Sequence, residues 1–127
     1  MLDKNALTFN LESEDYRFNR PRYPSELYTL IKKYSNYCDM AWDCACGNGQ
    51  VAIDLVSIFS NIEASDISEN QILNSFQHES INYTIQNSED TNFPDHYFDL
   101  VCAAQCLHWF DCDKYFKEIK RVLKKNG

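Results

Sequence analysis

Two carboxylates stand close to a pair of glycines in this chain of 127 residues. Asp43 precedes Gly47 and Gly49 in the stretch D-C-A-C-G-N-G, and Asp66 follows 19 positions after Gly47. A glycine loop lets the backbone approach a ligand closely, and an acidic residue about 20 positions further on can accept hydrogen bonds from the hydroxyls of a ribose. The spacing therefore indicates a site for a ligand that contains a nucleoside.

The charge around this loop discriminates between two such ligands. Gly47, Gly49 and Ala52 also fit the dinucleotide-binding fingerprint, so NAD is an alternative. Its pyrophosphate would lie close to the carboxylate of Asp43, and residues 34–113 contain no lysine or arginine to compensate. S-adenosylmethionine (SAM) carries an ammonium group and a sulfonium cation, which an acidic loop attracts. The sequence favours SAM, and NAD remains the alternative.

Composition and charge exclude several function classes. The net charge is −7; all 12 lysines and arginines lie in residues 4–33 or 114–125, whereas residues 34–113 hold 13 acidic residues. Such an acidic middle would repel a phosphate backbone, so we expect no nucleic-acid partner. We find no apolar run of about 20 residues and no secretion-signal pattern, so we expect a cytoplasmic protein with no membrane partner. We expect the late basic residues to form the solvated side of a helix: Lys117, Lys120, Arg121, Lys124 and Lys125.

The six cysteines show no paired spacing typical of metal sites. We interpret them as reduced residues of the core and expect no metal. A zinc or redox site at Cys44 and Cys46 is the alternative.

Alternating strands and helices must position the glycine loop. Helical spacing predicts a helix that opens at Pro24, a helix from Val51 to Phe59, a helix that begins with a reciprocal capping box of Ser68 and Gln71, and a last helix. The last helix should bury Tyr115, Phe116, Ile119, Val122 and Leu123. Buried strands are predicted at residues 39–45, 62–67, 81–85 and 98–104, with a turn-rich connector at 87–97 and Asp99 hydrogen bonded at the start of the fourth strand.

This alternation predicts an α/β fold with a parallel sheet, in which ligands bind at the carboxyl ends of the strands. The length indicates one domain, with a lid and helix in residues 1–37 and a Rossmann-like core in residues 38–127.

At these residues the chain resembles the class I SAM-dependent methyltransferases, and more narrowly the trans-aconitate methyltransferase-like (type 11) family. The stretch from Asp43 to Gly49 is similar to the family's D-x-G-x-G-x-G loop, with Ala45 at the first glycine; we expect an ordinary backbone conformation there. Residues 87–101 are similar to the family's G-D-A-E-x-L-P-F…F-D-L-V run, and residues 103–110 resemble the segment that lines the acceptor side of the pocket.

The resemblance implies a Rossmann-like parallel sheet of order 3-2-1-4 flanked by helices, truncated after the fourth strand and its helix, with SAM as cofactor and S-adenosylhomocysteine as product. Asp66 would bind the ribose, Ile67 would pack on adenine and Asn87 would accept from the adenine amino group. The full set of cofactor-binding residues that it implies is Tyr16, Arg20, Asp43, Ala45, Cys46, Gly47, Gly49, Gln50, Asp66, Ile67, Asn87, Ser88 and Gln105.

The implied reaction is methyl transfer to a small-molecule acceptor, an in-line displacement that needs orientation and no metal. For a carboxylate acceptor, as in the trans-aconitate relatives, Arg17, Arg20 and Arg22 would anchor the anion, with Trp109 beside the acceptor. An amine or hydroxyl acceptor would use His108 as a base; alternatively, His108 and Trp109 only line the pocket. An inactive SAM-binding module and an NAD(P)-binding oxidoreductase fragment are the alternative functions.

The end of the chain, Arg121 to Gly127, looks like the family's R-V-L-K-P-G-G turn into a fifth strand. The fourth strand would then be an exposed apolar edge at residues 100–104. We expect self-association to cover this edge, or the chain to be a fragment of a longer protein.

Overall fold

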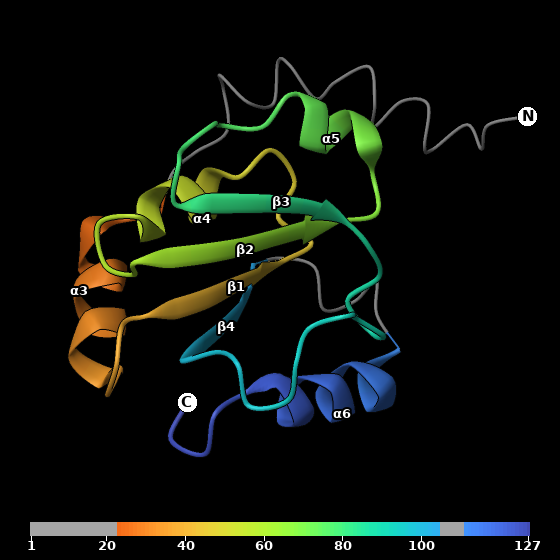
Figure 1. Cartoon of the computed structure of the whole chain (residues 1–127). Helices are drawn as coiled ribbons and strands as arrows, with labels where there is room; N and C mark the ends of the chain where they lie inside the picture. Colours follow the sequence, from red (N-terminus) through yellow and green to blue (C-terminus); the bar gives the residue numbers. More distant parts are fainter. Residues whose placement is uncertain (1–22, 105–110) are drawn as a thin grey trace, which may run out of the picture.

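The computed structural model describes residues 23–104 and 111–127, which form a sheet of four strands with helices on both faces (Figure 1). The strands are β1 (Met40–Cys44), β2 (Asn61–Asp66), β3 (Ile81–Ile85) and β4 (Leu100–Ala103). The helices are α3 (Ser25–Tyr34), α4 (Gln50–Leu55), α5 (Glu69–Leu73) and α6 (Cys112–Val122). These elements follow the predicted alternation, and β3 has the predicted bounds.

All strand pairs are parallel, and the order β3-β2-β1-β4 confirms the expected fold class. In the register, Cys44 at the end of β1 lies opposite Ser65 in β2 and Ala103 in β4. Asp66 at the end of β2 lies opposite Ile85 at the end of β3. The loops that follow β1, β2 and β3 therefore all begin at the carboxyl ends of the strands, on one side of the sheet, where the predicted site lies.

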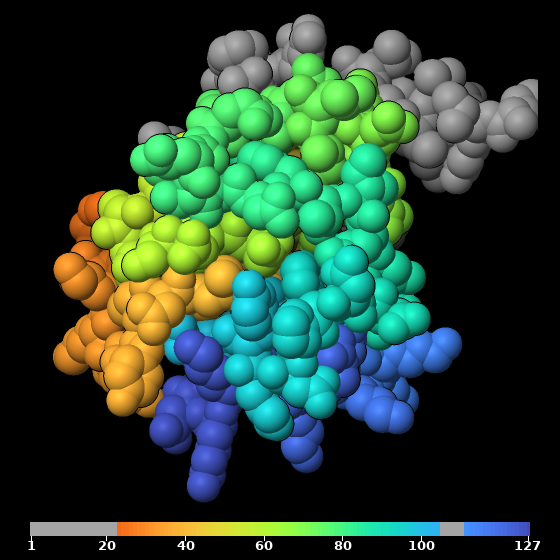
Figure 2. Space-filling model, viewed as in Figure 1, coloured from red at the N-terminus to blue at the C-terminus, as the bar shows by residue number. Residues whose placement is uncertain are grey.

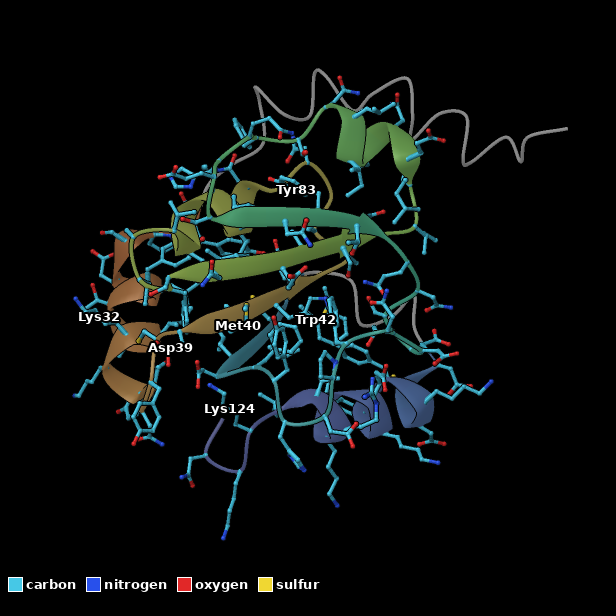
Figure 3. The ribbon with its side chains drawn as sticks, viewed as in Figure 1. Lys32, Asp39, Met40, Trp42, Tyr83 and Lys124 are labelled. Carbon is cyan, nitrogen blue, oxygen red and sulfur yellow. The ribbon has the colours of Figure 1, made fainter. Side chains whose placement is uncertain are left out.

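The alternating side chains of β1 build two separate cores. Ala41 faces α4 and belongs to a cluster that includes Leu55, Phe59 and Ile62. Trp42 faces the opposite side (Figure 3) and joins the aromatic core, which consists of Trp42, Cys44, Phe93, Phe98, Tyr115 and Val122. α6 and the connector between β3 and β4 supply most of the aromatic core, so both are fastened to the same face of β1.

Ring contacts hold the aromatic core together. Phe98 is 0% exposed and stacks on Trp42 with ring centroids 5.7 Å apart. Phe93 meets both rings edge-on, at 5.2 Å from Trp42 and 4.9 Å from Phe98. Since Phe93 belongs to the connector, these contacts fix the connector against the sheet.

Asp99 ties together the amino ends of β1 and β4. Its Oδ2 accepts from the N–H groups of Asp39 and Met40, both at 3.0 Å, and its Oδ1 accepts from Lys124 Nζ at 3.0 Å (Figure 3). Burial alone would raise the pKa of this carboxyl, but the bonds from Met40, Lys124 and Asp39 outweigh it and lower the pKa. The predicted hydrogen-bonding role of Asp99 at the strand start is therefore confirmed.

Three expectations about side chains were wrong. Phe116, predicted in the buried stripe of α6, is 55% exposed, and Glu118 is buried instead. Lys124 and Arg121 do not belong to a purely solvated side, because Lys124 binds Asp99 and Arg121 binds Glu118. Local periodicity assigns charge to solvent, whereas here the partners are distant in the sequence.

The capping box of α5 forms only on one side. Ser68 Oγ accepts from Gln71 N–H at 3.3 Å, as predicted. The reciprocal bond is replaced, because Ser68 N–H donates to Asp66 Oδ1 at 2.9 Å. The start of α5 is thereby linked to the end of β2.

The described cysteines are not in disulfides, and they occupy different environments. Cys44 and Cys46 are buried, Cys38 and Cys102 are half-buried, and Cys112 is exposed, contrary to the prediction of a core position. Within residues 23–104 and 111–127 no cluster of histidine, cysteine and acidic side chains is arranged to hold a metal ion. No helix in that part of the chain is long and apolar enough to cross a membrane.

β4 lies at an edge of the sheet, next to β1 alone among the described strands. Its four residues are half-buried. Self-association through this edge remains a prediction, which the structure of one chain does not test.

Alanine substitutions of two phenylalanines test which of the two rings belongs to the aromatic core. Phe98→Ala should lower the free energy of unfolding by about 3–5 kcal/mol, because it opens a cavity beside Trp42. The matched control, Phe116→Ala, should cost less than about 1 kcal/mol, since this ring is largely solvated. Urea unfolding followed by circular dichroism measures both. Equal losses would contradict the assignment of Phe116 to the surface.

Candidate functional site

The loop between β1 and α4 turns back over the end of β2. Cys46 N–H donates to Ser65 O at 2.8 Å, and the loop passes through left-handed backbone at Ala45 (φ 48°), Gly47 (φ 58°) and Gly49 (φ 88°). The expectation of an ordinary conformation at Ala45 was therefore wrong. An alanine in this region costs about 1 kcal/mol, because its Cβ crowds the following carbonyl oxygen. The structure explains why the family pattern has a glycine at this position.

Gly49 is required for space as well as for its backbone angle. A Cβ at this position would collide with the hydroxyl of Tyr83, which β3 extends toward the loop. That hydroxyl donates to Phe76 O, while Phe76 N–H donates to Asn48 O at 2.9 Å. The glycine loop therefore lies directly against the segment that enters β3.

The carboxylate of Asp66 joins the end of β2 to the glycine loop. Gly47 N–H donates to its Oδ2 at 2.9 Å, and Ser68 N–H donates to its Oδ1 at 2.9 Å. Each carboxylate oxygen can accept more than one hydrogen bond, so both retain capacity for the hydroxyls of a ribose. The role predicted for Asp66 is compatible with this geometry and stays a prediction.

Two acidic side chains, Asp43 and Asp66, stand at the loop, and residues 34–113 contain no lysine or arginine. Asp43 is 1% exposed, so its charge can act on a ligand through its field, while its side chain is almost closed to direct contact. Burial, followed by the charges of Asp43 and Asp66, raises the pKa of the Cys46 thiol well above its ordinary value. A protonated thiol is a poor nucleophile.

Apolar side chains are exposed beside Asp66. Ile67, which follows Asp66 directly, is 76% exposed, and Ile85, opposite Asp66 in the register, is 54% exposed. Exposed aliphatic side chains next to the carboxylate that is predicted to bind a ribose fit the flat face of a base. The position of Ile67 is thus compatible with adenine packing.

The connector begins with a bond to the same strand end. Gln86 N–H donates to Asp66 O at 3.1 Å. Asn87 is exposed, and its Oδ1 accepts from Glu89 N–H at 3.0 Å, which leaves a further lone pair for a ligand. Ser88 is 4% exposed. The structure thus brings Asn87 to the edge of the sheet that carries Asp66.

An ion pair in α6 contacts the connector at Thr91, and α6 and the connector lie side by side in Figure 2. Arg121 meets Glu118 through two bonds, Nε to Oε1 at 2.7 Å and Nη2 to Oε2 at 2.9 Å. Glu118 Oε2 also accepts from Thr91, through the N–H group and through Oγ1 at 2.7 Å. The bonds from Arg121 lower the pKa of Glu118 to about 2, although burial opposes the shift and Thr91 assists it.

A surface hollow of about 560 Å³ lies elsewhere, between α3 and α4. Tyr28, Lys32, Asp54 and Ser57 line it. Asp54 lies in the last turn of α4 and Ser57 follows the helix, so both are at the end that is remote from the glycine loop. The hollow is therefore separate from the candidate site.

The structure brings together the predicted residues that it describes. Residues 43–50 run from the end of β1 to the start of α4, Asp66 and Ile67 lie at the end of the neighbouring strand β2, and Asn87 and Ser88 follow β3. Seven predicted site residues lie outside the described residues: Tyr16, Arg17, Arg20, Arg22, Gln105, His108 and Trp109.

Sequence reasoning missed Tyr83, Glu118 and Arg121. The spacing of Glu118 and Arg121, three positions apart on a helix, is a signal that could have indicated an ion pair. Nothing local indicated that Tyr83 lies over Gly49.

Comparisons with known proteins point in one direction. The family model described as "Methyltransferase domain" matches residues 42–127. A protein of Dictyostelium discoideum named as a methyltransferase is 32% identical over 120 residues, which cover 94% of this chain and 46% of the relative. The mitochondrial arginine hydroxylase NDUFAF5 of Rattus norvegicus is 33% identical over 109 residues, which cover 84% of this chain and 31% of the relative.

Among solved structures, a type II methyltransferase from Anaeromyxobacter dehalogenans superimposes with a TM-score of 0.81 at 35% identity. The match covers 85% of this chain and 46% of that chain. This chain thus spans about half the length of the methyltransferase relatives it matches.

The strained alanine gives a first test of the loop. Ala45→Gly should raise the free energy of unfolding by a few tenths to about 1 kcal/mol, because glycine adopts a positive φ at no steric cost. The matched control is Ala64→Gly in β2, where an extended backbone predicts a loss of stability. Thermal unfolding measures both, and a destabilised Ala45→Gly protein would contradict the left-handed assignment.

Acid should weaken the ion pair of α6. Because the folded pKa of Glu118 is lowered from 4.5 to about 2, its contribution to stability is full above about pH 4.5 and is lost as the pH falls toward 2. Glu118→Gln should therefore cost roughly 1–3 kcal/mol at pH 7, and this difference from the wild type should shrink below pH 4.5. Melting temperatures across this range test it, with the exposed Glu79→Gln as control. A difference independent of pH would contradict the ion pair.

Proposed function

This chain belongs to the class I SAM-dependent methyltransferases, and from that membership we propose that it forms the cofactor-binding part of an enzyme that methylates a small-molecule acceptor. SAM is the cofactor. The NAD alternative is therefore set aside. Since the chain spans about half of its relatives, activity and acceptor are proposals for the whole protein.

The observation that carries the proposal is the bond between Gly47 N–H and the Asp66 carboxylate at the carboxyl edge of the sheet. This bond places the carboxylate that would bind the ribose beside the glycine loop, whose backbone can come close to a ligand. With Asp43 near and no lysine or arginine in residues 34–113, the loop suits a cationic ligand better than a pyrophosphate. These residues therefore fit SAM.

Each of these residues would bind a different part of the cofactor. Asp66 would accept from the ribose hydroxyls, Ile67 would pack on the adenine face, and Asn87 would accept from its amino group. The sulfonium group of SAM supplies an already activated methyl carbon, so the chain contributes mainly orientation and charge. The buried charges of Asp43 and Asp66 would favour the cationic cofactor over its neutral-sulfur product.

A carboxylate is the acceptor class that we propose, as in the trans-aconitate methyltransferases that the sequence resembles. Arg17, Arg20 and Arg22 would anchor it, and Trp109 would line the acceptor side. His108 would serve as a base only for an amine or a hydroxyl. All five residues lie outside the described residues, so this assignment depends on the sequence alone.

Two other functions define what must be measured. An inactive SAM-binding module would keep all the described residues of the site and lack turnover. The rat relative named as an arginine hydroxylase has a comparable identity over a shorter stretch, 33% over 109 residues against 32% over 120 for the Dictyostelium protein. Binding and methyl transfer therefore need separate assays.

Calorimetric titration with SAM, S-adenosylhomocysteine and NAD tests the cofactor site. We expect micromolar binding of the first two, weakened at least tenfold by Asp66→Ala, because hydrogen bonds to a charged group contribute about 1.5–3 kcal/mol. The control is Glu79→Ala, an exposed carboxylate before β3 that should leave the affinity unchanged.

The outcomes separate the candidate functions. Binding of NAD alone would overturn the methyltransferase proposal. Binding of SAM without transfer of a labelled methyl group to a panel of carboxylates, amines and hydroxyls, in a protein of the relatives' full length, would favour the inactive module.

A further inference from the structure

The connector at residues 86–97 contains Asn87, which would accept from the adenine amino group, and Ser88, a predicted cofactor-binding residue, yet it contains no helix or strand. Its position must therefore come from contacts outside itself. We propose that the ion pair of Glu118 and Arg121 in α6 positions this connector and thereby controls how well the site discriminates the adenine base. This inference rests on the function proposed above.

Glu118 is the group that holds the connector backbone. It is 7% exposed, and its Oε2 accepts from both the N–H and the hydroxyl of Thr91. Two donors from one residue fix both the place and the rotation of the chain there. A buried carboxylate is expensive without charge compensation, which the two bonds from Arg121 provide.

Arg121 reaches further along the connector. Its Nη1 donates to Phe93 O at 2.8 Å and to Asp95 Oδ1 at 2.7 Å. The backbone carbonyl of Arg121 accepts from His96 N–H at 2.9 Å. Its Nη2 also donates to Thr91 O and Oγ1, each at 3.4 Å. A single residue of α6 therefore contacts four positions of the connector, in addition to Glu118.

The near side of the connector is fastened to the cofactor edge. Gln86 N–H donates to Asp66 O at 3.1 Å, and Gln86 Oε1 accepts from Asn92 N–H at 3.2 Å. This second bond closes residues 86–92 into a loop. Asn87 and Ser88 are in that loop, between the attachment to Asp66 and the attachment of Thr91 to Glu118. A displacement at Thr91 would therefore move the adenine-contacting residues relative to Asp66.

A third contact links the loop to the start of the same helix. Asp111 N–H donates to Glu89 Oε1 at 2.9 Å, and Glu89 N–H in turn donates to Asn87 Oδ1 at 3.0 Å. Both ends of α6 therefore contact the loop. Asp111, the N-cap of the helix, binds Glu89, while Glu118 and Arg121 near the C-terminus of the helix bind Thr91. The helix acts as a rigid brace for the adenine side of the site.

A purely structural ion pair and a positioning ion pair predict different binding. General loosening of the fold would weaken every nucleoside ligand alike. Misplacement of Asn87 would instead weaken recognition of the adenine amino group and leave the ribose contact at Asp66 intact. S-Inosylhomocysteine, which carries an oxygen in place of that amino group, distinguishes the two cases.

The variants are Arg121→Lys, which keeps the charge and loses the bidentate contact with Glu118, and Thr91→Val. The second variant removes the hydroxyl that donates to Glu118 and accepts from Phe93 N–H and Arg121 Nη2, each at 3.4 Å. Lys120→Gln is the control, an exposed basic residue next to Arg121 on the same helix. Calorimetry gives the affinities for S-adenosylhomocysteine and S-inosylhomocysteine, and circular dichroism establishes that each variant is folded.

We expect Arg121→Lys to weaken S-adenosylhomocysteine roughly tenfold, Thr91→Val to weaken it about threefold, and both to change S-inosylhomocysteine less than twofold. Lys120→Gln should change neither. Equal losses for both ligands, or none, in a folded variant would overturn the positioning role. If Arg121→Lys does not fold, Thr91→Val decides. If the wild-type chain binds neither ligand, the proposed cofactor site itself has failed, and this inference fails with it.

Discussion

The site depends on one short-range interaction, the acceptance of backbone N–H groups by the carboxylate of Asp66. Gly47 and Ser68 donate to its two oxygens, each at 2.9 Å, so the loop after β1 and the helix after β2 are joined at one point. The parallel register sets this geometry, because it ends the two strands at the same edge. The bond from Gly47 adds to that of Cys46 N–H with Ser65 O, and it sets the glycine loop directly against the carboxylate proposed to hold a ribose.

Charge is distributed so that the site stays acidic while the rest of the sheet is neutralised. Near the end of the chain, two basic side chains pair with buried carboxylates: Arg121 with Glu118, and Lys124 with Asp99. Arg121 also meets the exposed carboxylate of Asp95. None of these contacts lies at the glycine loop. The negative charges of Asp43 and Asp66 would attract a cationic ligand at this loop.

Much of the fold could be predicted from the sequence, because strand and helix periods are local signals. The bounds of β3 and the strand order follow from such patterns combined with the family resemblance. The burial of Glu118 could not be predicted, since its partner Thr91 is 27 positions away. Ala45 shows the same limit, because the closure of the loop on Ser65 of a different strand, and not local propensity, imposes its positive φ. The sequence predicted the site residues whose chemistry requires a glycine or an acid. It did not predict the distant residues that hold them in place.

The supports explain why a site on loops can be rigid. Loops have no ladder of their own, so their geometry is only as well defined as their contacts with helices and strands. Here the glycine loop lies against Tyr83, the connector is held by α6, and both are attached to Asp66 at the end of β2. Because α6 and the connector also share the aromatic core with Trp42 in β1, movement of the helix would disturb the packing of the central strand. The ion pair of Glu118 and Arg121 therefore has a rigid base, which a positioning contact needs if it is to transmit its geometry to the cofactor.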